Sequence, residues 1–288
     1  MIEQFKNKTP YTQILILLLI GIVSIVILSI ISSVLMTLLY PEMSKLSAQI
    51  QMKQFPVQYM IGTYLPFQIG LFLVPGMLYF VYKKSLNTQE KPTHKPLDYL
   101  WSLGLFGLLF CMLPFLTTIN SAILESIDML ATVEHESAAY VKSLNHLIGP
   151  LASTESYLTA LIIIGLLVPI CEELFFRGFI LNHIAHTRNN NWIGVLLSAF
   201  VFTLLHLNWQ QFLPILCFGI ALGVIYVITK SIFPGLILHA LNNSINVIWM
   251  RQENTPSFLE NYNPYLSAAL VLMLLLLLAL YHKRLQLK

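Results

Sequence analysis

Long apolar runs alternate with short polar segments along the whole chain. A helix needs roughly 20 apolar residues to cross a hydrocarbon core about 30 Å thick, and about eight runs approach that length. They lie near residues 13–39, 59–82, 97–119, 157–184, 191–208, 212–230, 232–250 and 265–282. The runs are rich in leucine and isoleucine and lack the alternation of barrel strands. The pattern predicts an all-α, polytopic transmembrane bundle of about eight helices, whose links near Gln210 and Ser231 also suit broken or re-entrant helices.

Composition supports the membrane class, and the charges indicate an orientation. Hydrophobic residues make up 57% of the chain and charged residues 10%, which excludes an ordinary soluble domain. With the N-terminus in the cytoplasm, the inner segments hold most of the basic residues, as the positive-inside rule requires. The inner ones are Lys6, Lys8, Lys83, Lys84, Lys91, Lys95, Arg188, Lys230, Lys283, Arg284 and Lys288, and the outer ones are Lys45, Lys53, Lys142 and Arg251. We therefore expect an integral protein of a bacterial plasma membrane with both termini cytoplasmic, whose partner is the lipid bilayer and not nucleic acid.

The distribution of polar residues divides the chain into three parts. Residues 1–156 have no ionisable residue in the centre of their apolar runs, which predicts an amino-terminal transmembrane scaffold. Its last part, 121–156, has apolar residues at helical spacing that predict an amphipathic helix on the outer face. These are Ile123, Ile127, Leu130 and Val133. Intramembrane polar residues gather in 157–250, the predicted catalytic core, and 251–288 is predicted to be a carboxy-terminal transmembrane anchor.

Three charged residues lie inside the fourth apolar run: Glu172, Glu173 and Arg177. Charges at this depth cost at least a few kcal/mol each and usually mark a functional site. Residues four apart share a helix face, so we expect Glu173 and Arg177 to form an ion pair. Glu172 lies about 100° away from its neighbour and is left for a different partner. For this ion pair, a purely structural role and a role in catalysis are equally good interpretations.

Two further spans supply polar side chains of a kind that serves hydrolysis. His206 lies on the fifth span, and His239 and Asn243 lie one turn apart on the seventh. With Glu172 they predict a pocket between the fourth, fifth and seventh helices. In one chemistry, Glu172, His206 and His239 bind a divalent metal, for which zinc is the expected ion, and the metal activates a water. In the other, Glu172 is the general base on a water oriented by His206, and His239 with Asn243 stabilises the oxyanion without any metal. A lone intramembrane histidine is also a common helix-to-helix hydrogen bonder.

At these residues the chain resembles the CPBP family, which groups type II CAAX prenyl endopeptidases with Abi bacteriocin-immunity proteins. The resemblance covers about 157–250 and rests on the motifs EExxxR, FxxxH and HxxxN, each on its own helix. They are Glu172-Glu173 with Arg177, Phe202 with His206, and His239 with Asn243. The resemblance implies an intramembrane endopeptidase of the metalloprotease or glutamate type, cutting a lipid-anchored CAAX-like or membrane-embedded peptide.

The resemblance also implies a role for each candidate site residue. Glu172 would activate the water, with His206 as its partner. His239 and Asn243 would bind the metal or stabilise the oxyanion. Glu173 and Arg177 would hold the local structure.

Functions from two other classes stay open. A non-catalytic membrane scaffold or bacteriocin self-immunity protein would use the same fold without turnover. A proton-coupled transporter would also carry intramembrane acids and histidines, although no internal repeat is visible in the chain.

Overall fold

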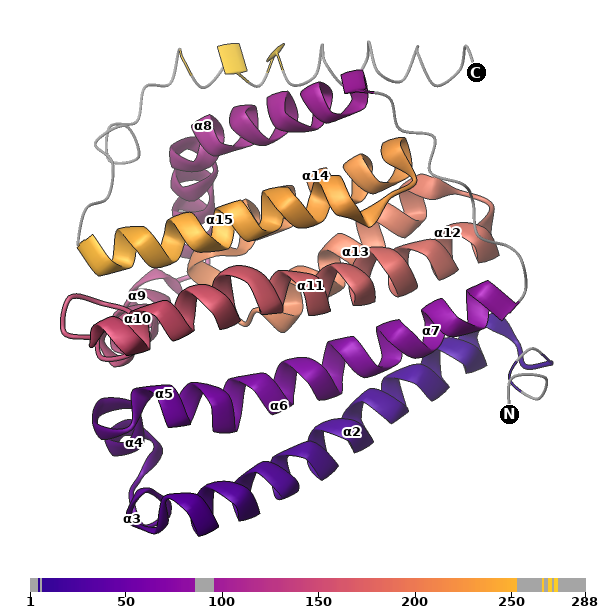
Figure 1. Ribbon diagram of the computed structural model, residues 1–288. Helices are drawn as coiled ribbons and strands as arrows, with labels where there is room; N and C mark the ends of the chain where they lie inside the picture. The colour runs from indigo at the N-terminus through magenta and orange to yellow at the C-terminus, as the bar shows by residue number, and fades with distance from the viewer. Residues whose placement is uncertain are drawn as a thin grey trace.

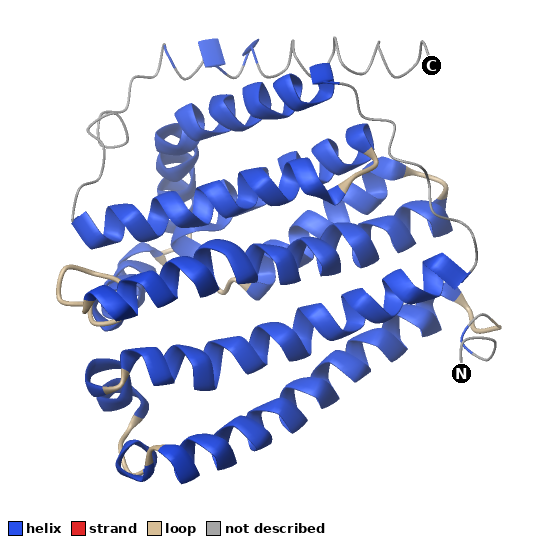
Figure 2. Cartoon of the chain, viewed as in Figure 1, coloured by secondary structure: helices blue, strands red, loops and turns tan. Residues whose placement is uncertain are grey.

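The computed structural model describes residues 5, 7–85, 96–252, 266, 269, 270, 272 and 273. Within this part of the chain every regular element is a helix (Figure 2). The amino-terminal elements are α2 (Pro10–Leu39), α3 (Pro41–Ser44), α4 (Ala48–Gln54), α5 (Pro56–Tyr59), η1 (Met60–Tyr64), α6 (Leu65–Gln68), η2 (Ile69–Leu73), α7 (Val74–Ser85), α8 (Pro96–Ser126) and α9 (Leu130–Leu144). The others are α10 (Thr154–Ala160), η3 (Leu161–Leu167), α11 (Val168–Glu173), η4 (Leu174–Leu181), α12 (Asn182–Arg188), α13 (Asn191–Leu205), η5 (Trp209–Gln211), α14 (Phe212–Thr229) and α15 (Ile232–Gln252). The expected all-α bundle is confirmed.

The helices form a row of roughly antiparallel rods (Figure 1). Helix α2 packs on the segment from α5 to α7, which packs on the segment from α10 to α12, followed by α13 to α15 and then α8. In the part of the chain that the structure describes, five helices are long and apolar enough to cross a membrane: Pro10–Leu39, Pro56–Ser85, Asp98–Ser126, Thr154–Arg188 and Trp209–Thr229. Much of the apolar surface of α2 is exposed, as a lipid-facing helix requires.

Three of the predicted spans fall outside these five. The fifth, predicted at 191–208, is the shorter apolar helix Asn191–Leu205. The seventh corresponds to α15, a helix of 21 residues that includes polar residues along its length. The last, 265–282, lies largely outside the described residues. The links near Gln210 and Ser231 are a short 3₁₀ turn and a tight turn between helices.

The predicted amphipathic helix at 121–156 is wrong as a single element. Ile123 belongs to α8, which ends at Ser126. The helical conformation is interrupted at Asp128, whose φ is 56°. Of the four apolar residues expected on one helix face, Ile123 and Ile127 are exposed and Val133 is buried. The left-handed backbone at Asp128, a conformation that aspartate tolerates, rotates α9 relative to α8 and divides the periodic pattern.

The second long helix contains two π-helical stretches, η1 and η2, on either side of α6. Pro66 has no N–H, so the carbonyl of Gly62, one turn earlier, loses its helical partner. The hydroxyl of Ser32 on α2 donates to that carbonyl at 2.8 Å. The irregular helix is therefore tied to α2 inside the bundle, where an unpaired carbonyl would be costly.

The turn after α13 is held by a side chain from α8. Asn120 donates through Nδ2 to the carbonyls of Trp209 and Gln210, at 2.9 and 3.0 Å, and its Oδ1 accepts from the N–H of Leu213 at 3.0 Å. Non-helical backbone within a membrane protein needs such partners. Asn120 thereby fixes the place where α13 ends, one residue before His206.

The two ends of the bundle differ in charge. Helices α7, α12 and α14 end together on the side of Lys83, Lys84, Arg188 and Lys230. The opposite end, around α3, α9 and α10, carries most of the acidic side chains among the described residues, including Glu42, Glu134, Glu136 and Glu155. The separation fits the predicted orientation, which stays a prediction.

Candidate functional site

The ion pair expected between Glu173 and Arg177 is present at the centre of the bundle. Nη1 of Arg177 lies 2.6 Å from Oε1 of Glu173, and both side chains are 1% exposed. Nη2 of Arg177 also donates to the carbonyl of Gly219 on α14 at 3.0 Å, and the guanidinium lies 5.0 Å from the ring centre of Phe202. The pair therefore joins the fourth span to α13 and α14.

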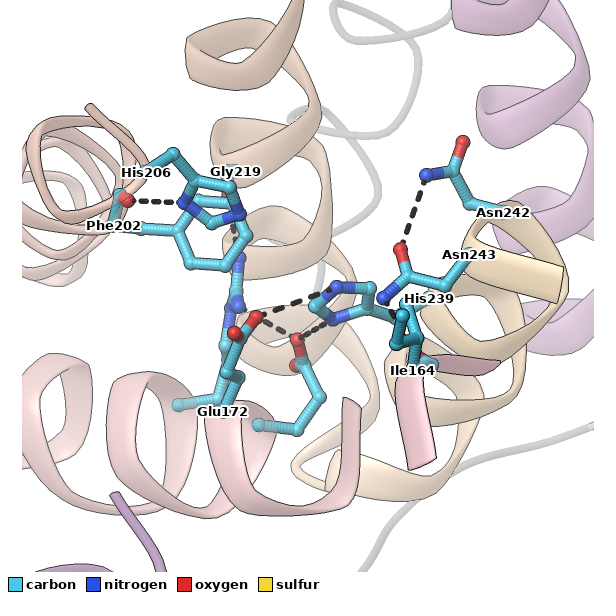
Figure 3. A network of polar contacts seen from close by, with 10 residues as sticks. Ile164, Glu172, Phe202, His206, Gly219, His239, Asn242 and Asn243 are labelled. Atoms are coloured by element: carbon cyan, nitrogen blue, oxygen red, sulfur yellow. Dashed lines mark hydrogen bonds and ion pairs between the residues drawn. The ribbon is translucent and has the colours of Figure 1, made fainter. Parts of the chain in front are cut away.

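His239 lies between the two carboxylates (Figure 3). Its Nδ1 is 2.9 Å from Oε1 of Glu173, and its Nε2 is 3.6 Å from Oε2 of Glu172. A carboxylate only accepts hydrogen bonds, so the proton of the first contact lies on Nδ1. Oε2 of Glu172 is buried and has no hydrogen-bond partner among the described residues. Glu172, the acid that Arg177 does not neutralise, can therefore bind another group through this oxygen.

His206 caps the C-terminal end of α13 and approaches Glu172 from the opposite side of the site. Its Nδ1 donates to the carbonyl of Phe202 at 2.7 Å, which leaves Nε2 as an acceptor. Leu207, the next residue, has a φ of 49°, a left-handed conformation that is unfavourable for leucine. The His206 residue is exposed, whereas Glu172 is buried.

The contacts of Phe202 give a reason for the phenylalanine at the start of the FxxxH motif. Its ring contacts those of His206 and His239, with centroid separations of 4.4 and 5.8 Å, as well as the Arg177 guanidinium. One buried aromatic side chain therefore positions two imidazoles and the cation.

Asn243 lies beside His239 but makes no hydrogen bond to either carboxylate among the contacts found in the described residues. Its Nδ2 donates to the carbonyl of Ile164 on η3 at 3.1 Å, and its Oδ1 faces Nδ2 of Asn242 at 3.5 Å (Figure 3). Its observed role is to join α15 to the fourth span.

A cavity of about 140 Å³ adjoins Glu172 and His206. Its walls come from the second, fourth and fifth spans: Phe67, Gln68, Phe72, Glu172, Phe176, Leu205 and His206. Polar contacts join the fourth span to the seventh helix, but the residues that line this cavity include some from the second span and none from the seventh. The predicted pocket between the fourth, fifth and seventh helices therefore stays a prediction. Sequence reasoning missed Gln68, whose only signal was an amide in the middle of an apolar run.

The described residues contain no group of three or more His, Cys, Asp or Glu side chains arranged to hold a metal ion. The donor chemistry of the predicted set nevertheless suits one. Both imidazoles are bound through Nδ1 to an oxygen, which orients Nε2 as a ligand would be oriented. Glu172 adds a buried oxygen without a partner. A metal held by Glu172, His206 and His239 stays a prediction.

Comparison with known proteins gives one finding. Residues 154–245 match the family model described as type II CAAX prenyl endopeptidase Rce1-like. Neither the search of curated proteins nor that of solved structures gave a match. The matched segment runs from α10 into α15 and contains Glu172, His206, His239 and Asn243, whereas Gln68 lies outside it. Together with the five membrane-length helices, the match supports an integral membrane protein with protease activity. Residues 154–245 are therefore similar to the Rce1-like type II CAAX prenyl endopeptidases, a protease family, and this similarity is consistent with the CPBP resemblance.

Proposed function

We propose that the protein is an intramembrane endopeptidase in which Glu172 activates the attacking water. One observation carries the proposal: Oε2 of Glu172 is buried and accepts no hydrogen bond from the described residues, and Glu172 borders a cavity that it shares with His206. The adjacent Glu173 is bound through its Oε1 atom by both Arg177 and His239, whereas Glu172 has no such pair of close contacts. Two neighbouring acids in such different surroundings support different roles, one in the reaction and one in the structure.

The reaction follows from these positions. Glu172 takes a proton from water while the water oxygen forms a bond to the scissile carbonyl carbon, whose π electrons move to the carbonyl oxygen. As the C–N bond breaks, the proton on Glu172 passes to the leaving nitrogen. His206 would present its Nε2 to the water as an acceptor, and His239, whose Nε2 lies 3.6 Å from Oε2 of Glu172, would stabilise the oxyanion when Nε2 is protonated.

A bound metal would be held by Glu172, His206 and His239, and it would supply Lewis-acid activation of water and substrate. Glu173 and the Phe202 carbonyl would then orient the two imidazoles through their Nδ1 atoms. Asn243 keeps α15 against η3 in either chemistry.

A second cavity supports a lipid-anchored substrate. It has a volume of about 680 Å³ and lies where α7, α12 and α14 end, which is the predicted cytoplasmic side. Apolar side chains such as Met77, Phe80, Leu174 and Phe233 line it beside polar ones. Leu174 directly follows Glu173 in the sequence. We propose that this cavity accepts the lipid chain of a CAAX-like peptide.

The test is cleavage of a prenylated CAAX peptide by the full chain in proteoliposomes. Glu172→Gln keeps the size of the side chain and removes the base, so we expect kcat to fall about 10²–10⁴-fold. Glu155→Gln, a change of the same kind on an exposed residue at the start of α10, is the matched control and should leave kcat unchanged. Cleavage by Glu172→Gln at the wild-type rate, or no cleavage by the wild type, would count against the proposal. Chelation followed by addition of Zn²⁺ decides between the two chemistries, because only the metal-dependent one loses and regains activity.

A further inference from the structure

Gln68 is a polar residue in a position where the fold gives it no partner. It ends α6 in the middle of the second long helix, and its side chain is 9% exposed. Its Oε1 is buried and makes no hydrogen bond with any residue that the structure describes. An amide oxygen that is removed from water without gaining a hydrogen bond destabilises the folded state. A packing role alone would be better served by leucine or methionine.

A second buried glutamine shows what a structural role looks like in the same bundle. Gln13 on α2 is 6% exposed, and its Nε2 lies within hydrogen-bond distance of the carbonyls of Phe5 and Lys8 and of the hydroxyl of Tyr82. Gln13 therefore satisfies backbone groups at the start of its helix. Gln68 makes no comparable contact, so its partner is sought in the cavity that it lines.

The surroundings of Gln68 indicate what that partner is. Four of the seven residues around the cavity are apolar, and the polar ones are Gln68, Glu172 and His206. Oε1 of Gln68 and Oε2 of Glu172 are both buried acceptors that lack a donor. A volume of about 140 Å³ has room for more than one water molecule. Water is the simplest molecule that supplies hydrogens to both oxygens.

We propose that Gln68 is a further catalytic residue, whose carboxamide oxygen holds one hydrogen of the attacking water while Glu172 takes the other. This inference rests on the proposed peptidase function. With both hydrogens engaged, a lone pair of the water oxygen is free to attack the carbonyl carbon. The hydrogen on Gln68 stays on the water oxygen through the attack, and only the proton bound to Glu172 is transferred. The second span thus contributes to the reaction by orienting the nucleophile.

The inference predicts opposite effects on turnover and stability. Gln68→Leu removes the oxygen that orients the water, so kcat for the prenylated peptide should fall about 10–100-fold with KM within about twofold. The same change removes a buried acceptor without a partner, so the unfolding temperature in detergent should stay the same or rise. A residue with a purely structural role would lose stability and keep its turnover per folded molecule.

Gln13→Leu is the matched control, because it replaces a glutamine of similar burial that does have partners. It should lower the unfolding temperature and leave kcat per folded molecule unchanged. Wild-type kcat in Gln68→Leu, or a loss of kcat that merely follows a loss of folded protein, overturns the inference. An inactive Glu172→Gln with an active Gln68→Leu refutes only the role of Gln68, whereas an active Glu172→Gln refutes the peptidase proposal itself.

Discussion

Arg177→Met tests whether the buried ion pair holds the site together. The substitution keeps most of the volume of the side chain and removes its charge. It leaves the Glu173 carboxylate buried at 1% exposure with only His239 as partner. It also removes the hydrogen bond to the Gly219 carbonyl and the contact with the Phe202 ring.

The expected cost follows from these contacts. Removing one partner of a buried ion pair costs about 3–5 kcal/mol, because the remaining charge loses its compensation. The lost contacts with Gly219 and Phe202 place Arg177→Met in the upper half of that range. In the double variant Glu173→Gln with Arg177→Met no isolated charge remains, and the glutamine oxygen still accepts from Nδ1 of His239. We expect the double variant to be about 2 kcal/mol more stable than the sum of the single effects implies.

The assay is equilibrium unfolding of the purified protein in mixed detergent micelles, followed by far-ultraviolet circular dichroism. Lys45→Met is the control: its ion pair with Glu42 has a similar separation, 2.9 Å, but the side chains are 67% and 77% exposed. Exposed pairs contribute about 1 kcal/mol or less, so this variant should unfold almost as the wild type does. Additive effects in the double variant, or an equal cost for Lys45→Met and Arg177→Met, would refute the reasoning.

Two more substitutions test how distant elements serve the site. Asn120→Ala removes the side-chain partner of three backbone groups, the carbonyls of Trp209 and Gln210 and the N–H of Leu213. The free energy of unfolding in detergent should therefore fall by roughly 3 kcal/mol. Unchanged stability would show that this turn does not depend on α8. Gly178→Leu projects into the 680 Å³ cavity, since an added Cβ would meet only the Glu173 carbonyl oxygen, at 3.8 Å. Steady-state kinetics should show KM rising about tenfold for a prenylated peptide and unchanged for the unprenylated one, and an equal change for both would place the lipid chain elsewhere.

Local features of the site were open to prediction from the sequence, because they depend on helix geometry alone. Glu173 and Arg177 are four residues apart, so any helix through them brings the two charges onto one face. The same periodicity separates Glu172 from its neighbour and leaves it without the guanidinium. Long apolar runs likewise define most of the helices, since the backbone must satisfy its own hydrogen bonds in lipid.

Features that combine distant segments were not open to prediction in this way. The sequence pattern favours a fifth span up to residue 208, but α13 ends at Leu205 because Asn120, some 90 residues away, binds the turn that follows. Asn243 shares a face with His239, yet its amide is taken by the Ile164 carbonyl of a neighbouring helix.

The sequence by itself determined that the chain forms apolar helices and that acids, imidazoles and an amide lie on three of them, since both follow from residue type and a period of 3.6. Only the tertiary structure decided which of these atoms meet. His239 reaches both carboxylates, and Gln68 from the second span borders the cavity beside Glu172. The reason is physical: contacts between helices depend on their rotation and packing, which distant prolines, turns and side-chain caps alter.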